Sequence, residues 1–102
     1  MKNTRIPIDR KQIVTICRKY HIQKLSLFGS VLRDDFRPDS DIDVLVEFEP
    51  GHTPGFLRLY QIEEELSPSL GGHRPDLVTP GFLNHRIRNR VLAEAEIQYA
   101  KG

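Results

Sequence analysis

The segment LFGSVLRDDFRPDSDIDVLVEF, residues 27–48, contains the two features that decide the fold and the chemistry of this chain. Its second half alternates apolar and other residues, which predicts a strand over residues 41–48 because successive side chains of a strand point to opposite faces. The face that we expect to pack on the core carries Ile42, Val44, Val46 and Phe48. Asp41 and Asp43 fall together on the other face.

The two aspartates repel each other at this spacing, which costs free energy unless a ligand neutralises their charge. Side chains at positions i and i+2 of a strand lie roughly 7 Å apart along the backbone, and aspartate is uncommon in strands. A cation would relieve the repulsion between Asp41 and Asp43, and hard oxygen ligands suit Mg²⁺. In the alternative interpretation Asp41 caps a turn and Asp43 points into solvent. For an isolated pair that alternative would be preferred.

A Gly-Ser pair precedes the aspartates, where a short predicted strand, residues 24–28, ends. Gly29 lets the backbone approach a bulky ligand, and Ser30 can open a short helix over residues 31–36 whose N–H groups face a phosphate. Arg33 could support the same anion, and Arg37 is a weaker candidate. Alone, this motif could equally be a turn with a serine cap and a surface arginine.

The two motifs together predict a phosphate cradle followed by a metal-binding carboxylate pair, which is the equipment for nucleotidyl transfer. Two metal ions about 4 Å apart can stabilise the attacking and leaving oxygens of an in-line displacement. A third carboxylate normally helps to hold the second ion or takes the proton of the nucleophile. Asp76, in the predicted strand RPDLVT, is the best candidate, although it could otherwise be a turn aspartate after Pro75.

Length and charge narrow the class of protein. The chain has 102 residues, which predicts a single domain over residues 1–102, and its net charge is +1. No bulk charge favours DNA or an anionic membrane, so direct DNA binding and membrane association are not expected. The single cysteine, Cys17, cannot form an internal disulfide and lies on an apolar helix stripe. We expect a cytoplasmic protein with Cys17 in its core.

The remaining elements follow from periodicity and turn residues. Asp9 has the position of an N-cap for a helix over residues 10–20, and Pro75 suggests that its strand starts at a sheet edge. We also expect helices over residues 56–66 and 82–95, the latter with core contacts from Phe82, Ile87, Val91 and Leu92, and a strand over residues 96–100. This order predicts an α/β (α+β) fold with a small mixed sheet flanked by helices.

The four histidines, at positions 21, 52, 73 and 85, do not have the short spacing of a helical metal site such as HxxxH. We expect most of them to be surface residues. His52 lies in the loop EPGHTPG, which could close over a nucleotide.

The spacing Gly29-Ser30, ten residues, Asp41-Ile42-Asp43 resembles the GSx10DxD signature of the polymerase-β-like nucleotidyltransferase superfamily. The segments EFEPG, DLVTP and RNRVLAEAE resemble its smallest members, the minimal nucleotidyltransferase (MNT) group. The resemblance implies that Asp41 and Asp43 bind two Mg²⁺ ions and that Asp76 completes the set. It also implies that Gly29 and Ser30 hold the triphosphate of a nucleotide.

The same resemblance implies an activity and a partner. Members of this group resemble antitoxins that pair with a helical HEPN-domain toxin, and some transfer AMP from ATP to a tyrosine of that toxin. Two alternatives stay open: a non-catalytic antitoxin that occludes its toxin, and a transferase for a small-molecule acceptor. The second would need a further pocket, for example at a dimer interface, and the sequence leaves homo- or hetero-oligomers open.

Overall fold

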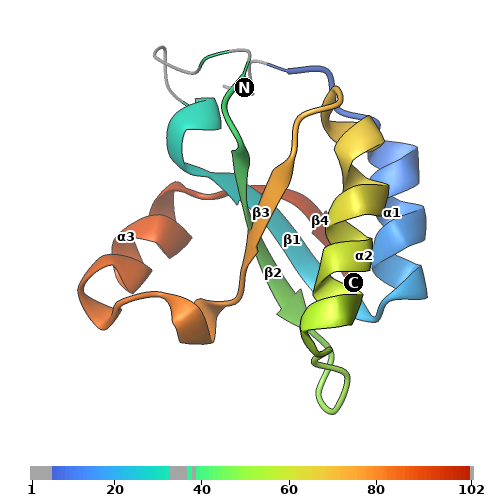
Figure 1. The fold of residues 1–102 in the computed structure, drawn as a ribbon. Coiled ribbons are helices and arrows are strands. Elements are labelled where there is room, and N and C mark those ends of the chain that lie inside the picture. The colour runs from blue at the N-terminus through green and yellow to red at the C-terminus, as the bar shows by residue number, and fades with distance from the viewer. Residues whose placement is uncertain (1–5, 33–36, 38, 102) are drawn as a thin grey trace.

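The computed structural model describes residues 6–32, 37 and 39–101 of the chain. The helices α1–α3 and the strands β1–β4 are labelled in Figure 1, and short 3-10 helices, named η here, join several of them. In chain order the elements are α1 Arg10–Lys19, β1 Ile22–Phe28, η1 Gly29–Leu32, β2 Ile42–Phe48, α2 Phe56–Leu66, η2 Ser67–Leu70, β3 Pro75–Val78, η3 Pro80–Phe82, α3 His85–Glu94 and β4 Glu96–Ala100.

The four strands form one mixed sheet in the order β3-β2-β1-β4. β1 pairs antiparallel with both β2 and β4, and β2 pairs in parallel with β3. A parallel pair needs a crossover connection, which here is α2 with η2. β3 lies at an edge of the sheet, as Pro75 predicts, because proline lacks the N–H that an inner strand must donate. The predicted small mixed sheet with flanking helices is confirmed.

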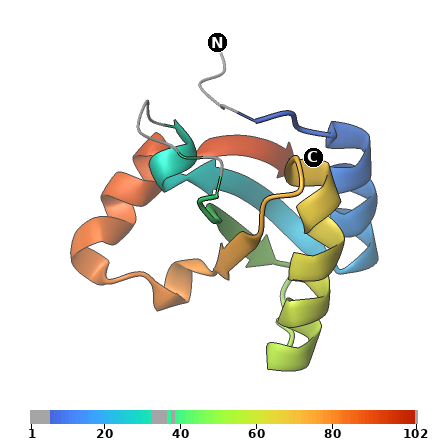
Figure 2. The same cartoon turned by 45° about the horizontal axis from the view of Figure 1, so that its top comes forward.

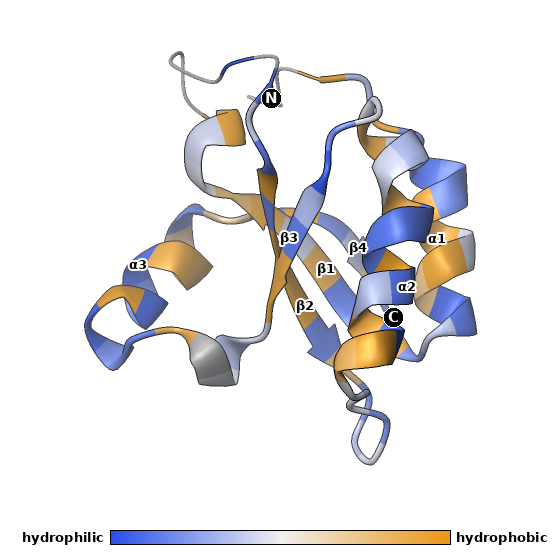
Figure 3. Cartoon of the chain, viewed as in Figure 1, coloured by the Kyte–Doolittle hydropathy of each residue, from blue (hydrophilic) through white to orange (hydrophobic). Residues whose placement is uncertain are grey.

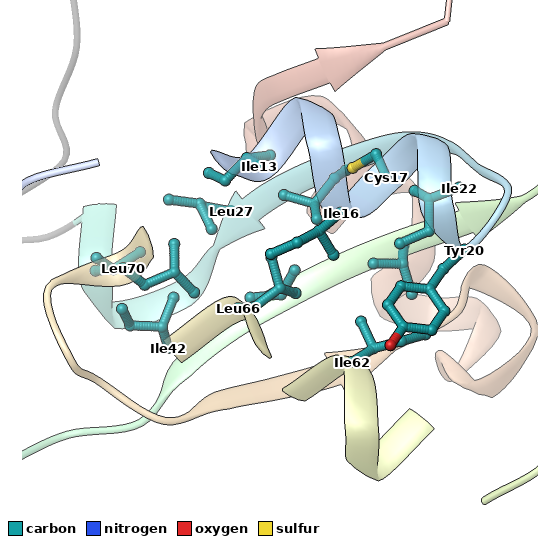
Figure 4. Packing of buried hydrophobic residues seen from close by; sticks show 14 residues of the cluster. Ile13, Ile16, Cys17, Tyr20, Ile22, Leu27, Ile42, Ile62, Leu66 and Leu70 are labelled. Atoms are coloured by element: carbon teal, nitrogen blue, oxygen red, sulfur yellow. The ribbon is translucent and has the colours of Figure 1, made fainter. Parts of the chain in front are cut away.

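α1 and α2 cover one face of the sheet, and the main core lies between them and that face (Figure 2). The Asp9 side chain caps α1 by accepting a hydrogen bond of 3.1 Å from the Gln12 N–H. The alternation in β2 is confirmed, because Ile42, Val44 and Val46 are fully buried and Phe48 packs against the core. Figure 4 shows how the aliphatic side chains of α1, α2 and the strands interlock.

The opposite face of β2 is also partly covered. Leu45 is 2% exposed, and Leu83, which follows η3, is buried as well. Asp43, on the same face of β2 as Leu45, is half-buried. Asp43 therefore lies near one end of a sheet face that is covered at Leu45 and partly exposed at Glu47.

The core contacts expected of Ile87, Val91 and Leu92 in the last helix are wrong, whereas the one expected of Phe82 concerns a side chain outside the described part of the structure. α3 begins only at His85, where the Asn84 side chain caps it by accepting from the Arg86 N–H at 2.8 Å, and none of its side chains is buried. Ile87 and Leu92 are 44% and 42% exposed. In Figures 1 and 2, α3 lies on the far side of the molecule from α1 and α2, and Figure 3 shows apolar segments along it. Its apolar residues have helical spacing, but no second layer covers them within the described chain.

Polar contacts to Glu65 of α2 join the two core helices. The Tyr20 hydroxyl donates to the Glu65 carboxylate, and Lys19 Nζ lies 3.1 Å from Glu65 Oε1. The hydrogen bond from Tyr20 lowers the pKa of Glu65, and the same bond raises the pKa of Tyr20. Nearby, burial raises the pKa of the Cys17 thiol to about 12, so this residue is a core thiol, as predicted.

The described residues contain no helix that is both long and apolar enough to cross a membrane.

Candidate active site

Two of the predicted carboxylates are neighbours across the parallel strands. Asp43 is the second residue of β2 and Asp76 is the second residue of β3, and the two are partners in the register of the β2–β3 pair. Partners on adjacent strands lie roughly 4.8 Å apart and point to the same face. Asp43 is half-buried, whereas Asp76 is exposed at the edge of the sheet. The pairing brings together residues that are far apart in the chain.

Asp41 lies at the same end of the sheet, directly before β2 begins at Ile42. It is exposed, so its carboxylate is accessible to a ligand. The predicted strand therefore starts one residue later than expected, and Asp41 belongs to the connection that enters it. All three predicted carboxylates gather where β2 and β3 begin.

Gly29 brings the first motif into contact with the second. It follows β1 directly, and the last residue of that strand, Phe28, is the register partner of Asp43. A Cβ placed on Gly29 would lie 2.3 Å from Oδ2 and 3.2 Å from Cγ of Asp43, and the φ angle of Gly29 is +78°. Only glycine allows both this close approach and this backbone conformation without strain. The Gly-Ser turn and the DxD strand thus form one continuous site.

The helix expected after the Gly-Ser pair differs in type and start. Gly29 and Ser30 are the first two residues of η1, which ends at Leu32, so Ser30 lies inside this short helix rather than capping a later one. Ser30 is half-buried. Arg33 lies outside the described residues, as does most of the helix predicted over residues 31–36.

A cavity of about 240 Å³ opens beside Asp41. Its other walls are Asp39, Ser40, Gly71, Gly72, His73 and Arg74. His73 Nδ1 lies 3.2 Å from the Ser40 carbonyl oxygen, and the Arg74 carbonyl accepts from the Ile42 N–H at 2.9 Å. Sequence reasoning missed the contribution of His73 and Arg74. The signal was the Gly71-Gly72 pair, two residues before the strand of Asp76, which marks a turn that can fold back onto the start of β2.

The donor set fits a hard divalent cation. Three carboxylates at one sheet end match the oxygen ligands that Mg²⁺ prefers. Among the described residues, the one set of three metal-ligand side chains whose ligand atoms all lie within 4.8 Å of one another is elsewhere, at His21, Glu49 and His52. The strands bring the three aspartates close together, but their carboxylate oxygens do not all lie within 4.8 Å of one another, as expected for like charges that repel each other.

Comparisons with known proteins identify the family and the fold. The family model of the nucleotidyltransferase domain matches residues 10–97. A provisionally named protein adenylyltransferase of Methanocaldococcus jannaschii is 37% identical over 87 residues, which are 85% of this chain and 86% of that protein. Protein adenylyltransferase MntA of Thermococcus cleftensis is 37% identical over 76 residues, which are 74% of each chain.

Solved structures share the fold. A provisionally named minimal nucleotidyltransferase superposes with a TM-score of 0.68 at 37% identity, covering 84% of this chain and 85% of the other. A toxin–antitoxin structure with AMP-PNP gives a TM-score of 0.70 at 20% identity, covering 92% and 75%. A complex of a tri-AMPylated HEPN toxin of Shewanella oneidensis with an MNT antitoxin gives 0.62 at 20% identity, covering 90% and 70%. These last two likenesses concern the fold alone. From the family match and the relatives, the chain belongs to the nucleotidyltransferase domain family, and its fold is that of the minimal nucleotidyltransferases.

Proposed function

We propose that the protein is an Mg²⁺-dependent antitoxin that transfers AMP from ATP to a tyrosine side chain of a HEPN-domain toxin and so neutralises it. The chain would act as one catalytic domain over residues 1–102. Support comes from the relatives that are named protein adenylyltransferases and from the fold shared with an MNT antitoxin that is bound to an AMPylated HEPN toxin. Within the chain itself, support comes from the site.

The observation that carries the proposal is the contact between Gly29 and Asp43, next to Asp76 in the register of the sheet. An open backbone and a carboxylate set share one sheet end, so a triphosphate held at the first would lie against the second. Gly29 has no side chain that would keep the phosphates away from its backbone, and the Ser30 hydroxyl can donate a hydrogen bond to them. Arg33, from its place in the sequence, is proposed to support the same anion.

Asp41 and Asp43 would hold the Mg²⁺ ions, with Asp76 completing the ligand set. When bound, these ions supply positive charge that neutralises the phosphate oxygens as negative charge shifts toward the leaving group. The side chains of this set are short, so the positions of β2 and β3 determine where the carboxylates lie. That rigidity favours a site that is positioned before the nucleotide arrives.

The transfer itself is an in-line substitution at the α-phosphorus of ATP. The acceptor oxygen forms a bond to that phosphorus, the bond to the bridging oxygen of the β-phosphate breaks, and pyrophosphate leaves with the electron pair. The hydroxyl proton of the acceptor needs a base. Asp76 is proposed to accept it, because Asp76 is an exposed carboxylate at the edge strand and an incoming side chain can reach it there.

The proposal is tested by intact-mass spectrometry of a HEPN-domain toxin from the same genome, incubated with the full chain, ATP and Mg²⁺. We expect the toxin to gain one or more AMP units, and peptide mapping to place them on tyrosine. Asp43→Asn and Asp76→Asn should each lower the transfer rate by about 100-fold or more, the range for losing one group that stabilises transition-state charge. A chelator in excess over Mg²⁺ should stop the transfer.

Glu94→Gln is the matched control, since it removes an exposed carboxylate of α3 outside the proposed site. Its transfer rate should equal that of the original chain. If the toxin never gains mass but is still bound and neutralised, and the aspartate variants protect as well as the original chain, the transferase mechanism is wrong. The non-catalytic, occluding antitoxin would then be the function.

A further inference from the structure

A second group of metal-ligand side chains lies at the opposite end of β2 from the aspartates. His21 is in the turn between α1 and β1, Glu49 directly follows β2, and His52 is in the loop that leads to α2. One ligand atom from each residue lies within 4.8 Å of the other two. Asp43 and Glu49 are separated by most of β2, roughly 20 Å at the rise of a strand, so the two places are independent. In Figure 1 this loop extends beyond the end of the sheet at which β2 ends.

Backbone hydrogen bonds fix these three residues relative to one another. The Glu49 N–H donates to the His21 carbonyl at 2.8 Å, and the His52 N–H donates to the Glu49 carbonyl at 3.0 Å. The two imidazole rings stack with centroids 3.9 Å apart and planes 18° from parallel. His21 has a φ angle of +59°, which is uncommon for a residue other than glycine. The loop is therefore folded onto the turn by main-chain bonds, with the two rings and the carboxylate on one side.

Two imidazoles and one carboxylate are a ligand set typical of zinc. In tetrahedral sites with bonds of about 2.0–2.1 Å, ligand atoms lie roughly 3.4 Å apart. An imidazole nitrogen binds a metal in the plane of its ring, so the two stacked rings cannot both face one ion as they lie. One ring would have to leave the stack by turning about its side-chain torsions, which brings the ligand atoms from within 4.8 Å of one another to that distance. Nitrogen ligands suit Zn²⁺ and its neighbours in the first transition row, whereas Mg²⁺ prefers oxygen. Three protein ligands would leave a fourth position for water.

One cation already neighbours the carboxylate. Lys101 Nζ lies 3.2 Å from Glu49 Oε1, and the Lys101 side chain is 59% exposed. An exposed ion pair of this kind contributes little, about 0–1 kcal/mol, so it competes weakly with a divalent ion. The ammonium group can turn into solvent when the carboxylate binds a metal, because its stem is flexible.

We propose that His21, Glu49 and His52 form a second metal site, for a divalent transition ion of the Zn²⁺ class, with Lys101 as its competitor. The site is separate from the aspartates and does not depend on the proposed transfer. Its bound ion clamps the loop between β2 and α2 to the turn between α1 and β1. Sequence reasoning missed it because the two histidines are far apart in the chain, and no spacing rule connects them.

The test is a Zn²⁺ titration of the full chain, free of any affinity tag and of bound metal, in the presence of excess Mg²⁺. We expect binding of one equivalent. His21→Asn and His52→Ala should each weaken it by at least about 100-fold, because changes that only support a ligand already cost 10–100-fold. Asparagine is chosen at position 21 because it tolerates a positive φ, so this variant keeps the turn. His85→Ala, which alters an exposed histidine of α3, should bind as the original chain does.

Two further measurements separate the site from incidental binding. Co²⁺ in place of Zn²⁺ should give the strong visible absorption of a tetrahedral centre, and this should vanish in the His21→Asn/His52→Ala double variant. Lys101→Ala should tighten Zn²⁺ binding by about two- to five-fold, the equivalent of an exposed ion pair. Equal Zn²⁺ affinity in the double variant, or loss of binding in Asp43→Asn, would overturn the proposal. Absence of binding to the original chain would also overturn it, and none of these results bears on AMP transfer.

Discussion

The carboxylate of Asp43 occupies the space that any side chain at position 29 would need. The Cβ of an alanine at Gly29 would lie 2.3 Å from Asp43 Oδ2, a separation that non-bonded atoms do not tolerate. This contact joins the end of β1 to the start of β2 at the one place where a nucleotide and its metal ions are proposed to meet. It therefore makes position 29 the most sensitive test of the site.

Gly29→Ala is expected to abolish transfer and to destabilise the fold by about 1–3 kcal/mol, since the φ angle of +78° adds strain to the displacement of Asp43. Gly51→Ala is a matched control: Gly51 has a φ angle of +80°, and a Cβ there would meet nothing within 4 Å. Urea unfolding of both variants measures the loss of stability, and the transfer assay measures the loss of activity. If Gly51→Ala lost as much stability and activity as Gly29→Ala, the contact with Asp43 would not be the cause.

The second prediction concerns Arg74, which lines the cavity beside Asp41 and whose carbonyl is anchored to β2. A guanidinium there can donate to phosphate oxygens. Arg74→Ala should raise the KM for ATP by about 10-fold or more, which corresponds to the loss of one charge-assisted hydrogen bond, with a smaller effect on kcat. Arg86→Ala, on the exposed face of α3, is the control for a lost positive charge. An unchanged KM in Arg74→Ala would remove Arg74 from the nucleotide site.

The contact between Tyr20 and Glu65 leads to a prediction on pH. The hydrogen bond from Tyr20 holds the pKa of Glu65 below its usual value, so the stability that Glu65 contributes is full above the unfolded pKa of about 4.3. That stability is lost as the pH falls through the lower, folded pKa. Tyr20 behaves in the opposite direction: its raised pKa gives stability that is present below about pH 10 and lost as the pH rises through the folded value.

Glu65→Gln should therefore lower the free energy of unfolding by about 1 kcal/mol at neutral pH and flatten its decline in acid, as measured by urea unfolding between about pH 3 and pH 7. The estimate is kept small because the Glu65 side chain is 37% exposed and water screens its charge. Glu64 is an exposed residue next to Glu65 on the same helix. Glu64→Gln should leave the decline of the free energy of unfolding in acid unchanged. The interpretation fails if Glu65→Gln keeps the pH dependence of the original chain.

The strand and helix that could be predicted from sequence are those with a strong local signal. The alternation of β2 predicts its buried face, and the periodicity between Gly55 and Ser67 predicts α2 with the observed limits, Phe56–Leu66. The spacing from Gly29 to Asp43 identifies the motif, and the structure explains it: the register of β1 and β2 brings these two residues into contact.

What could not be predicted depends on contacts between distant segments. Periodicity identifies an apolar stripe on α3 but does not say what covers it, and Ile87 and Leu92 are exposed. His73 and Arg74 join the cavity beside Asp41 only because the Gly71-Gly72 turn folds them against the start of β2. The grouping of His21 and His52 arises in the same way. The roles given to the aspartates remain predictions, and Arg33 lies outside the described residues.

The parallel pairing of β2 with β3 has a consequence for how the site comes into being. Asp43 and Asp76 become neighbours only after the chain between them has passed through α2 and η2 and returned to the sheet. Contacts between residues so far apart in sequence form late, because the entropy cost of closing the loop comes before the pairing contributes any favourable free energy. A nascent or partly folded chain that has made only the β1–β2 hairpin thus lacks a complete carboxylate set. The chain would then become catalytically active only once its folding is complete. The proposed AMP transfer would therefore begin only with the fully folded protein.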